Sequence, residues 1–280
     1  MILVSGSNGQ LGLELCRLLT EKHIDYIGKD KSELDITDKK KVNQTLLELK
    51  PTVIFHCAAY TAVDAAEDEG KEANYLINEV GSQNIAEAAK KINAKVVYIS
   101  TDYVFDGSNV EGGYKETDLV DPINEYGKAK LLGEKAIQEN LDDYYIIRTS
   151  WVFGQYGKNF VFTMLNLSET HEKLTVVNDQ FGRPTWTRSL AEFMLYLVEN
   201  NCDYGTYHFS NDETCTWYDF AQEILKDKKT NVEPVTSDKF PQKATRPEYS
   251  VMNLEKAKST GFQIISWKQA LAEMLSQEKL

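Results

Sequence analysis

The sequence lacks the features that mark several common classes of protein. It has no run of basic residues, and its formal net charge of −12 argues against nonspecific binding to nucleic acid. Its four cysteines include no CxxC pair, and no two of its four histidines have the spacing of metal ligands. No apolar stretch approaches the ~20 residues that a membrane-spanning helix needs, and the chain starts without a basic leader segment. We therefore expect a cytoplasmic protein with reduced thiols, no metal site, and neither a nucleic-acid nor a membrane partner.

Short apolar runs alternate with helical patterns through the first half of the chain. The runs are ILVSG, DYIGKD, TVIFHCAA, KVVYIS and YYIIRTS, and patterns such as LGLELCRLLTEK lie between them. Strands that alternate with helices of this length predict βαβ units and a parallel sheet. The strands are continuously apolar, as expected when helices cover both faces. We predict an α/β protein with a Rossmann-like, doubly wound parallel sheet.

The alternation becomes irregular after Trp151, where short elements mix with proline and glycine. We predict a dinucleotide-binding core over residues 1–150 and a smaller, mainly substrate-binding domain over residues 151–280. LTVVND and TRSLAEFMLYLVENN predict one more strand and helix, so residues 174–200 are expected to return to the core.

The segment GSNGQLG lies between the first predicted strand and the first predicted helix. Glycines there permit a tight turn and let backbone amides approach a pyrophosphate at the helix N-terminus. The GxxGxxG spacing is similar to that of extended short-chain dehydrogenases/reductases. The residues predicted to bind phosphate are Gly6, Ser7, Asn8, Gly9, Gln10, Leu11 and Gly12.

Asp30 ends the second predicted strand, where an acid that binds the cofactor ribose is expected. Lys29 and Lys31 flank it and are suited to a 2′-phosphate instead, so the residues leave NAD and NADP both open. DI resembles an adenine-contacting segment of the same superfamily, and the small residues of CAAY let the cofactor pass closely. The cofactor residues predicted outside the loop are Asp30, Lys31, Asp35, Ile36, Ala58, Ala59 and Tyr60.

YGKAK places Tyr126 and Lys130 four residues apart, on one face of a predicted helix. A free tyrosine has a pKa of ~10, and a nearby ammonium and an oxidised nicotinamide favour the phenolate and lower that value. The preceding STDYVF ends a strand, and a hydroxyl there can donate a hydrogen bond to a substrate carbonyl. Thr101 is the better candidate of Ser100 and Thr101, because it lies just beyond the apolar run. Upstream, NEVGSQN is similar to an NxxGxxN helix whose Asn78 either buttresses the site or serves helix packing.

Motifs along nearly the whole chain resemble those of the dTDP-4-dehydrorhamnose reductases, a family of extended short-chain dehydrogenases/reductases. They are GSNGQLG, AAYTAVDAAE, STDYVFDG, YGKAKLLGE, RTSWVFG, NDQFGRPT and ATRPEYSVMN. The resemblance implies NADPH, with NADH possible, and a dTDP-4-keto sugar nucleotide as substrate. It also implies that Thr101 binds the keto oxygen, that Tyr126 donates the proton, and that Lys130 orients the cofactor, which places Tyr126 and Lys130 among the cofactor-binding residues too.

The resemblance also suggests how the second half of the chain binds substrate. It implies that Trp151 packs on the sugar ring, and that side chains of GKNF, NDQFGRPT and TRP approach the nucleotide. A guanidinium fork in TRP matches the oxygens of a diphosphate. The residues expected to bind substrate are Thr101, Asp102, Tyr103, Trp151, Asn159, Gln180, Arg183 and Arg246.

One residue departs from the family pattern in a way that bears on assembly. Some members dimerise around a magnesium ion held by glutamates, one of them just after the PT segment. This chain keeps Glu14 in its first helix but has Arg188 in the later region, and a positive charge there argues against a bridging metal. We expect a monomer or a homodimer that no metal bridges.

Other functions remain compatible with the fold and the YxxxK pair. A sugar-nucleotide dehydratase normally follows its threonine with Asp-Glu, whereas here Asp102 and Tyr103 follow Thr101. A sugar-nucleotide 4-epimerase and a noncatalytic NADP-binding subunit stay open as alternatives. Stoichiometric consumption of NADPH separates an enzyme of the predicted kind from both.

Overall fold

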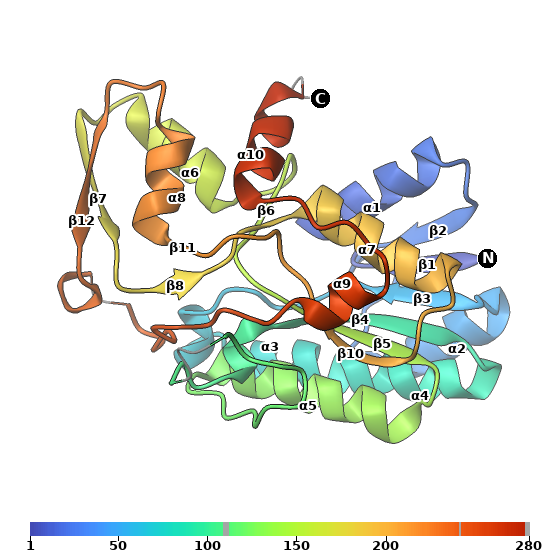
Figure 1. Ribbon diagram of the computed structural model, residues 1–280. Helices are drawn as coiled ribbons and strands as arrows, with labels where there is room; N and C mark the ends of the chain where they lie inside the picture. Colours follow the sequence, from blue (N-terminus) through green and yellow to red (C-terminus); the bar gives the residue numbers. More distant parts are fainter. Residues whose placement is uncertain (109–111, 241, 278–280) are drawn as a thin grey trace.

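The computed structural model describes residues 1–108, 112–240 and 242–277. At its centre lies a sheet of six strands in the spatial order β2-β1-β3-β4-β5-β10, and every pair in it is parallel (Figure 1). Because β2 lies on one side of β1 and β3 lies on the other, the winding direction reverses at the β1–β3 boundary. The doubly wound, Rossmann-like prediction is confirmed. The strands are β1 (Ile2–Ser5), β2 (Tyr26–Lys29), β3 (Val53–His56), β4 (Lys95–Thr101), β5 (Tyr144–Thr149) and β10 (Gly205–His208).

Helices cover both faces of this sheet (Figure 1). On one face α1 and α7 contact each other and bury Leu18 and Phe193 in one apolar cluster. On the other face α4 packs against both α2 and α5, and Ile85 and Ile137 belong to a second cluster. None of the helices within residues 1–108, 112–240 and 242–277 has the length and apolarity needed to cross a membrane. The five helices are α1 (Gln10–Glu21), α2 (Lys39–Leu49), α4 (Ser82–Ile92), α5 (Glu125–Asn140) and α7 (Thr187–Glu199).

Strand β4 lies in the middle of the sheet, between β3 and β5. Its sequence, KVVYIST, is rich in β-branched and aromatic residues, and Val96, Val97 and Tyr98 are fully buried. A continuously buried strand is what helices on both faces require. The strand ends at Thr101, so this residue lies near the centre of the carboxyl edge of the sheet, where parallel α/β folds bind their ligands.

The helical pattern between residues 71 and 92 is not one regular helix. It consists of α3 (Lys71–Tyr75), a π-helical segment (Leu76–Gly81) and then α4. The wider π turn re-aims side chains relative to a straight α-helix and is often found at functional sites. Asn78, which NEVGSQN singled out, lies inside this segment.

The second half of the chain forms a smaller layer beyond the carboxyl edge of the sheet (Figure 1). Helices α6, α8 and α10 pack with a two-stranded parallel pair, β7–β12, around a third apolar cluster that includes Phe220 and Trp267. Two shorter pairs, β6–β9 and β8–β11, connect this layer to the main sheet. The elements are β6 (Val152–Phe153), α6 (Phe160–Ser168), β7 (Lys173–Val177), β8 (Phe181–Gly182), β9 (Thr185–Trp186), β11 (Cys215–Thr216), α8 (Trp217–Ile224), β12 (Asn231–Val235) and α10 (Trp267–Ser276). Helix α9 (Glu255–Ser259) instead contacts β10 of the main sheet.

Residues 174–200, expected to return to the core, occupy two places. Strand β7 pairs with β12, outside the six-stranded sheet, whereas α7 packs on α1 against that sheet. The sixth strand of the sheet, β10, lies beyond this segment, and its residues GTYH were not predicted as a strand. The division of the chain at residue 150 stays a prediction.

Candidate active site

The glycine loop after β1 forms one wall of a cleft where the winding direction reverses. Gly6 has a φ of +70°, and a Cβ on it would lie 2.6 Å from the Ala58 backbone, so the position requires glycine. A Cβ on Gly12 would lie 2.1 Å from the Gly6 carbonyl oxygen, which holds α1 tightly against the loop. Gly9 caps α1 without a side-chain hydrogen bond, so the first amides from Gln10 onward are left for an outside acceptor.

The cleft has a volume of about 710 Å³ and lies between the ends of β1, β2 and β3. Four of its lining residues were not predicted: Ser32, Leu34, Cys57 and Ile77. They lie within or near the quoted DYIGKD, DI, CAAY and NEVGSQN segments, but only the folded chain shows that they face the same space. The predicted cofactor residues that line the cleft are Gly6, Asn8, Gly9, Asp30, Lys31, Asp35, Ile36, Ala58 and Ala59.

Three residues of the loop have other contacts. Ser7 is buried, and Leu11 packs against the apolar cluster under α1 and α7. The Gln10 side chain reaches the second half of the chain, where its Nε2 donates to the Val152 carbonyl at 3.4 Å and its Oε1 accepts from Asn159 Nδ2 at 2.9 Å. Gln10 therefore ties the glycine loop to the layer that is predicted to bind substrate.

Both oxygens of the Asp30 carboxylate accept hydrogen bonds within the protein. Its Oδ1 accepts from the Ser32 hydroxyl at 2.6 Å and the Ser32 amide at 2.8 Å, and its Oδ2 accepts from Asn8 Nδ2 at 2.5 Å. These bonds, that of the Ser32 hydroxyl foremost, hold the pKa of Asp30 below its ordinary value. Lys31 lines the cleft and Lys29 does not. Of the two lysines, Lys31 is therefore the one placed to meet a 2′-phosphate.

The NEVGSQN helix holds two walls of the cleft in place. Asn78 binds both backbone groups of Tyr60, accepting from its N–H and donating to its carbonyl, each at 3.0 Å. Asn84 Nδ2 donates to the Ile36 carbonyl at 2.9 Å. A Cβ on Gly81 would lie 2.6 Å from the end of the Ile36 side chain. This helix fixes the positions of Ile36 and Tyr60, two residues predicted to border the cofactor.

The start of α5 is pressed against the end of β4. The Asn124 side chain caps the helix by accepting from the Gly127 amide at 2.8 Å. A Cβ on Gly127 would lie only 2.1 Å from the Tyr103 carbonyl oxygen, so glycine allows this contact. As a result Tyr126 lies beside the strand end, with its hydroxyl hydrogen-bonded to the Thr101 hydroxyl. The predicted proton donor and the predicted keto-binding hydroxyl therefore meet.

Burial raises the pKa of the Tyr126 hydroxyl well above its ordinary value. The nearby Asp102 carboxylate raises that pKa further, and the hydrogen bond with Thr101 opposes the rise. This corrects the expectation that Lys130 lowers the pKa of Tyr126, because burial is the larger effect in the folded protein. Tyr126 therefore keeps its proton at neutral pH, as a proton donor must.

Lys130 lies one helical turn after Tyr126 and is only 2% exposed. Its Nζ sits 4.1 Å from the centre of the Tyr98 ring, a cation–π arrangement. Burial lowers the pKa of Lys130 to about 7, and the Glu134 carboxylate opposes that effect. A lysine with this pKa is charged only in part near neutrality.

The end of β4 carries further buried polar atoms. Asp102 is 2% exposed, and its Oδ1 accepts from the Thr101 hydroxyl at 3.1 Å. Within the part of the chain that the structure describes, Asp102 Oδ2 and the buried Ser100 hydroxyl have no hydrogen-bond partner. Burial raises the pKa of Asp102 to about 7. Tyr103 meets the Tyr126 ring edge-on at 6.1 Å, so the three residues after Ser100 surround the predicted proton donor.

Trp151 lies just past the end of β5, in a strained backbone conformation with a φ of +47°. Its indole stacks on Trp217, with ring centres 3.7 Å apart and planes within 13°. A Cβ on Gly182 would lie 2.6 Å from the Trp151 ring, so glycine at this position lets the backbone lie close to the indole. Trp217 was not predicted, because no motif or spacing links it to RTSWVFG.

The remaining predicted substrate residues use their polar atoms within the protein. Arg246 forms a two-pronged pair with the Asp64 carboxylate at 2.8 and 2.9 Å, where the sequence predicts a diphosphate contact. Arg183 Nη1 donates to the Met252 carbonyl at 3.0 Å, and Gln180 Nε2 donates to a serine hydroxyl at 3.0 Å. None of the hydrogen bonds just described joins Arg246, Arg183 or Gln180 to Tyr126, whereas Thr101 is in direct contact with it.

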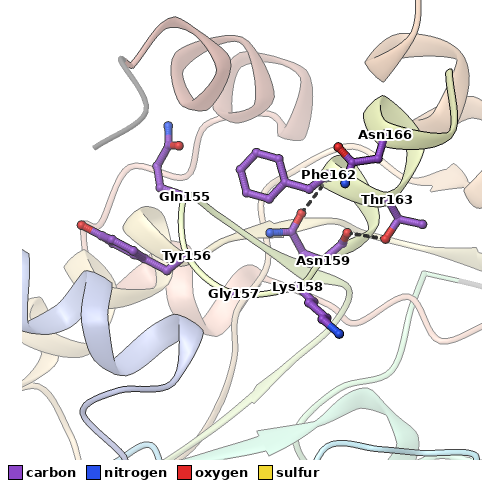
Figure 2. Close-up of a pocket in the computed structure, with 8 residues that line it drawn as sticks. All are labelled: Gln155, Tyr156, Gly157, Lys158, Asn159, Phe162, Thr163 and Asn166. Carbon is purple, nitrogen blue, oxygen red and sulfur yellow. Dashed lines mark hydrogen bonds between the residues drawn. The ribbon is translucent and has the colours of Figure 1, made fainter. Parts of the chain in front are cut away.

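A second hollow, of about 470 Å³, is lined by residues 155–159 and the first turns of α6. Figure 2 shows Asn159 at its centre, where the Asn159 side chain caps α6 through the Phe162 amide and its carbonyl accepts from Thr163. Asn159 is the one predicted substrate residue among those that line it. Lys158 and Gln155 give the hollow a polar wall.

Exposed aromatic side chains flank the segment NDQFGRPT. Phe181 is 41% exposed and pairs with Tyr249, at 6.2 Å between ring centres, and Phe240 is 46% exposed. Large exposed apolar rings are available for contact with a flat ligand group. Phe181 and Tyr249 lie inside quoted motifs and Phe240 does not, and the exposure of Phe181 and Phe240 is visible only in the structure.

Arg188 occupies the space beside the buried Glu14. Its Nη1 lies 3.5 Å from Glu14 Oε1 and 2.6 Å from Glu21, and its Nε lies 2.7 Å from Glu192. Within residues 1–108, 112–240 and 242–277, no three histidine, cysteine or acidic side chains cluster as metal ligands do. The glutamates around Arg188 are paired with a guanidinium.

Three comparisons relate this chain to known proteins. The family model of the RmlD substrate binding domain matches residues 1–280. The chain is 41% identical to the spore coat polysaccharide biosynthesis protein SpsK of Bacillus subtilis, over 99% of this chain and 97% of that protein. It is 40% identical to a dTDP-4-dehydrorhamnose reductase of Aggregatibacter actinomycetemcomitans, over 96% of each. A crystal structure of a dTDP-4-dehydrorhamnose reductase of Bacillus anthracis in complex with NADP superposes with a TM-score of 0.94, at 42% identity and 98% coverage of each chain.

Proposed function

The chain belongs to the RmlD substrate binding domain family, and from this premise we propose that it reduces dTDP-4-dehydro-L-rhamnose to dTDP-L-rhamnose with NADPH. The observation that carries the proposal is the hydrogen bond between Thr101 and Tyr126 at the end of β4, with Lys130 one turn further along the same helix. They lie at the same edge of the sheet as the cleft at the β1–β3 reversal.

The cleft fits a dinucleotide. Gly6 permits the close approach of the loop to Ala58, and the uncapped N-terminus of α1 offers amides to a pyrophosphate. Asp35 and Ile36 border the adenine end, and Lys31 with Ser32 supports a 2′-phosphate. When bound, NADPH supplies the hydride that reaches the keto carbon. Lys31→Ala is expected to weaken NADPH more than NADH, because only NADPH carries the 2′-phosphate.

Tyr126 supplies the proton that completes the reduction. Its raised pKa keeps the hydroxyl protonated until negative charge develops on the substrate oxygen, which then accepts the proton. Thr101 binds the same oxygen after its hydroxyl rotates away from Asp102, to which it donates in this structure. Lys130 lies one turn below and stabilises the phenolate that proton transfer leaves behind.

The second layer of the fold forms the substrate side of the site. The Trp151–Trp217 stack offers a rigid apolar surface for the sugar ring. The ion pair with Asp64 fixes the Arg246 side chain, which also contacts Tyr103. Arg246 therefore faces the substrate diphosphate from a fixed position, with its charge partly balanced by Asp64. Asn159, Gln180 and Arg183 shape this layer through their hydrogen bonds inside the protein.

The assembly and compartment are part of the proposal. Arg188 lies among Glu14, Glu21 and Glu192, which supports a monomer or a homodimer without a bridging metal. All four cysteines are free thiols, as is usual in a reducing compartment such as the cytoplasm.

The proposed function is tested by following NADPH absorbance with dTDP-4-dehydro-L-rhamnose, and repeating the assay with NADH and with the UDP analogue. We expect loss of one NADPH per sugar reduced, and a lower kcat/KM with the UDP analogue. A sugar that is converted without loss of NADPH contradicts the proposal and favours an epimerase or a dehydratase. NADPH binding without any turnover favours a noncatalytic subunit.

A further inference from the structure

Three chemically distinct side chains follow one another along the inner face of α5. Tyr126, Lys130 and Glu134 are four residues apart, so each lies one turn below the last. Tyr126 and Lys130 have roles in the proposed reaction. Glu134 has none so far, although it is 1% exposed and carries a carboxylate.

Glu134 is held by a two-pronged ion pair with Arg148 of β5. Arg148 Nε donates to Glu134 Oε1 at 2.9 Å, and Nη2 donates to Oε2 at 2.7 Å. The two side chains are 5% and 1% exposed. This geometry leaves the carboxylate little freedom, because a planar guanidinium fork fixes both of its oxygens.

Every other titratable group that acts on Lys130 is neutral near pH 7. Burial lowers the pKa of His56 to about 3, and burial raises the pKa of the Cys57 thiol and of the Tyr98 hydroxyl well above their ordinary values. Among the described residues, Glu134 is therefore the carboxylate that favours the ammonium form of Lys130.

Within residues 1–108, 112–240 and 242–277, Glu134 is the one carboxylate paired with the Arg148 guanidinium. His208 Nε2 lies 3.4 Å from Arg148 Nη1, and burial lowers the pKa of His208 to about 3, so this imidazole is neutral. The Phe105 ring lies 5.2 Å from the guanidinium carbon. One carboxylate thus lies between two buried cations, Arg148 and Lys130.

We propose that Glu134, fixed by Arg148, is a positioning residue that keeps Lys130 charged and in place below Tyr126. The inference rests on the proposed function, since it assigns Lys130 to the reaction. Loss of the Glu134 charge lowers the pKa of Lys130 further, because burial then acts with less opposition. As pH rises, Lys130 then loses its proton at a lower pH than in wild type. The cofactor affinity that depends on the ammonium form is lost over the same pH range.

A plain structural role makes a different prediction, and a double variant separates the two. Glu134→Gln alone leaves Arg148 buried without a counter-ion and is expected to destabilise the fold. Glu134→Gln with Arg148→Met removes both charges and keeps the volume. If the pair serves only the fold, this variant recovers stability and normal pH dependence together. If Glu134 serves Lys130, stability recovers but the pH dependence stays changed.

The measurement is NADPH affinity by fluorescence titration from pH 5.5 to 9, together with kcat over the same range. Loss of the Glu134 charge alone, one helical turn from Lys130, is expected to move the basic limbs of the NADPH-affinity and kcat profiles down by about one pH unit, which at pH 8 lowers affinity about tenfold. In the double variant the loss of the Arg148 charge offsets part of this effect, so we expect a smaller movement in the same direction, with affinity at pH 5.5 approaching that of wild type. Glu139→Gln, an exposed change on the same helix, is the matched control and leaves both limbs in place.

If the double variant folds and the basic limbs of its NADPH-affinity and kcat profiles stay where they are in wild type, the inference is wrong. If the double variant does not fold, Glu134→Asp decides, because the carboxylate then withdraws from Lys130 by about one methylene and keeps its charge. We expect a smaller downward movement of the NADPH limb for Glu134→Asp, and an unmoved limb refutes the role. The NADPH titration needs no sugar substrate, so it tests the role of Glu134 independently of turnover. Wild-type enzyme that binds NADPH but does not reduce the keto sugar would contradict the proposed function alone.

Discussion

Replacing Lys130 by Met removes a buried charge from the folded protein while nearly keeping the side-chain length. Lys130 is 2% exposed, and burial lowers its pKa to about 7 from an ordinary value of 10.5. A charged group that prefers the unfolded chain in this way reduces the stability of the fold. We therefore expect Lys130→Met to unfold at higher urea concentration than wild type, while losing activity.

The size and pH dependence of the effect follow from linkage. The unfolded chain binds the Lys130 proton more tightly than the folded protein does between about pH 7 and 10.5, so wild-type stability rises with pH across that window. The full difference corresponds to on the order of 5 kcal/mol below pH 7 as an upper bound. The advantage of the Met variant is therefore largest at low pH and shrinks by about 1.4 kcal/mol per pH unit above 7.

Urea unfolding of both proteins at pH 6.5 and pH 9.5 measures this directly. We expect a gain of about 2–4 kcal/mol at pH 6.5 and much less at pH 9.5. A variant that is less stable than wild type at pH 6.5, or a gain that does not change with pH, refutes the reasoning. In the same variant, loss of a charge-assisted hydrogen bond to the cofactor should weaken NADPH by roughly ten- to a hundredfold.

Three further changes test separate parts of the site. Tyr126→Phe should keep NADPH affinity but lower kcat by ~10²–10⁴-fold, and turnover within about threefold of wild type counts against Tyr126 as proton donor. Burial raises the pKa of Asp102 from 3.8 to about 7, so wild-type stability should fall as pH rises through that window; Asp102→Asn should lack this fall in urea midpoints at pH 4.5 and 7.5. EDTA should change neither the size-exclusion elution nor the activity, because Arg188 pairs with Glu14, Glu21 and Glu192; a shift to smaller species would reveal a metal bridge.

The sequence predicts the core of this fold well because its signals are local. Each strand of the sheet up to β5 is a short apolar run, and the run KVVYIST becomes the central strand β4. The requirement for glycine at Gly12 likewise reflects a contact within seven residues, with the Gly6 carbonyl, whereas that at Gly6 comes from Ala58, far along the chain. Strand β10 was missed because GTYH is short and half polar, and its place depends on pairing with β5, some 60 residues earlier.

The same contrast holds within the site. The spacing of Tyr126 and Lys130 on one helix is enough to place them on the same face, whereas the stack of Trp151 on Trp217 joins segments with no common pattern. The pairing of Arg246 with Asp64 spans 182 positions and could not be read from TRP alone. The rise in the pKa of Tyr126 that burial causes was not predicted, because a sequence shows its neighbours but not its burial.

The central claim is that this chain transfers a hydride from NADPH to the keto carbon of a dTDP sugar while Tyr126 supplies the proton. NADPH carrying deuterium at the transferable position of the nicotinamide C4 tests it most directly. We expect one deuterium at C4 of the product sugar for each NADPH consumed by wild type, and at least a hundredfold slower labelling by Tyr126→Phe. A product whose C4 hydrogen comes from water, or a product formed while NADPH is not consumed, would contradict the account.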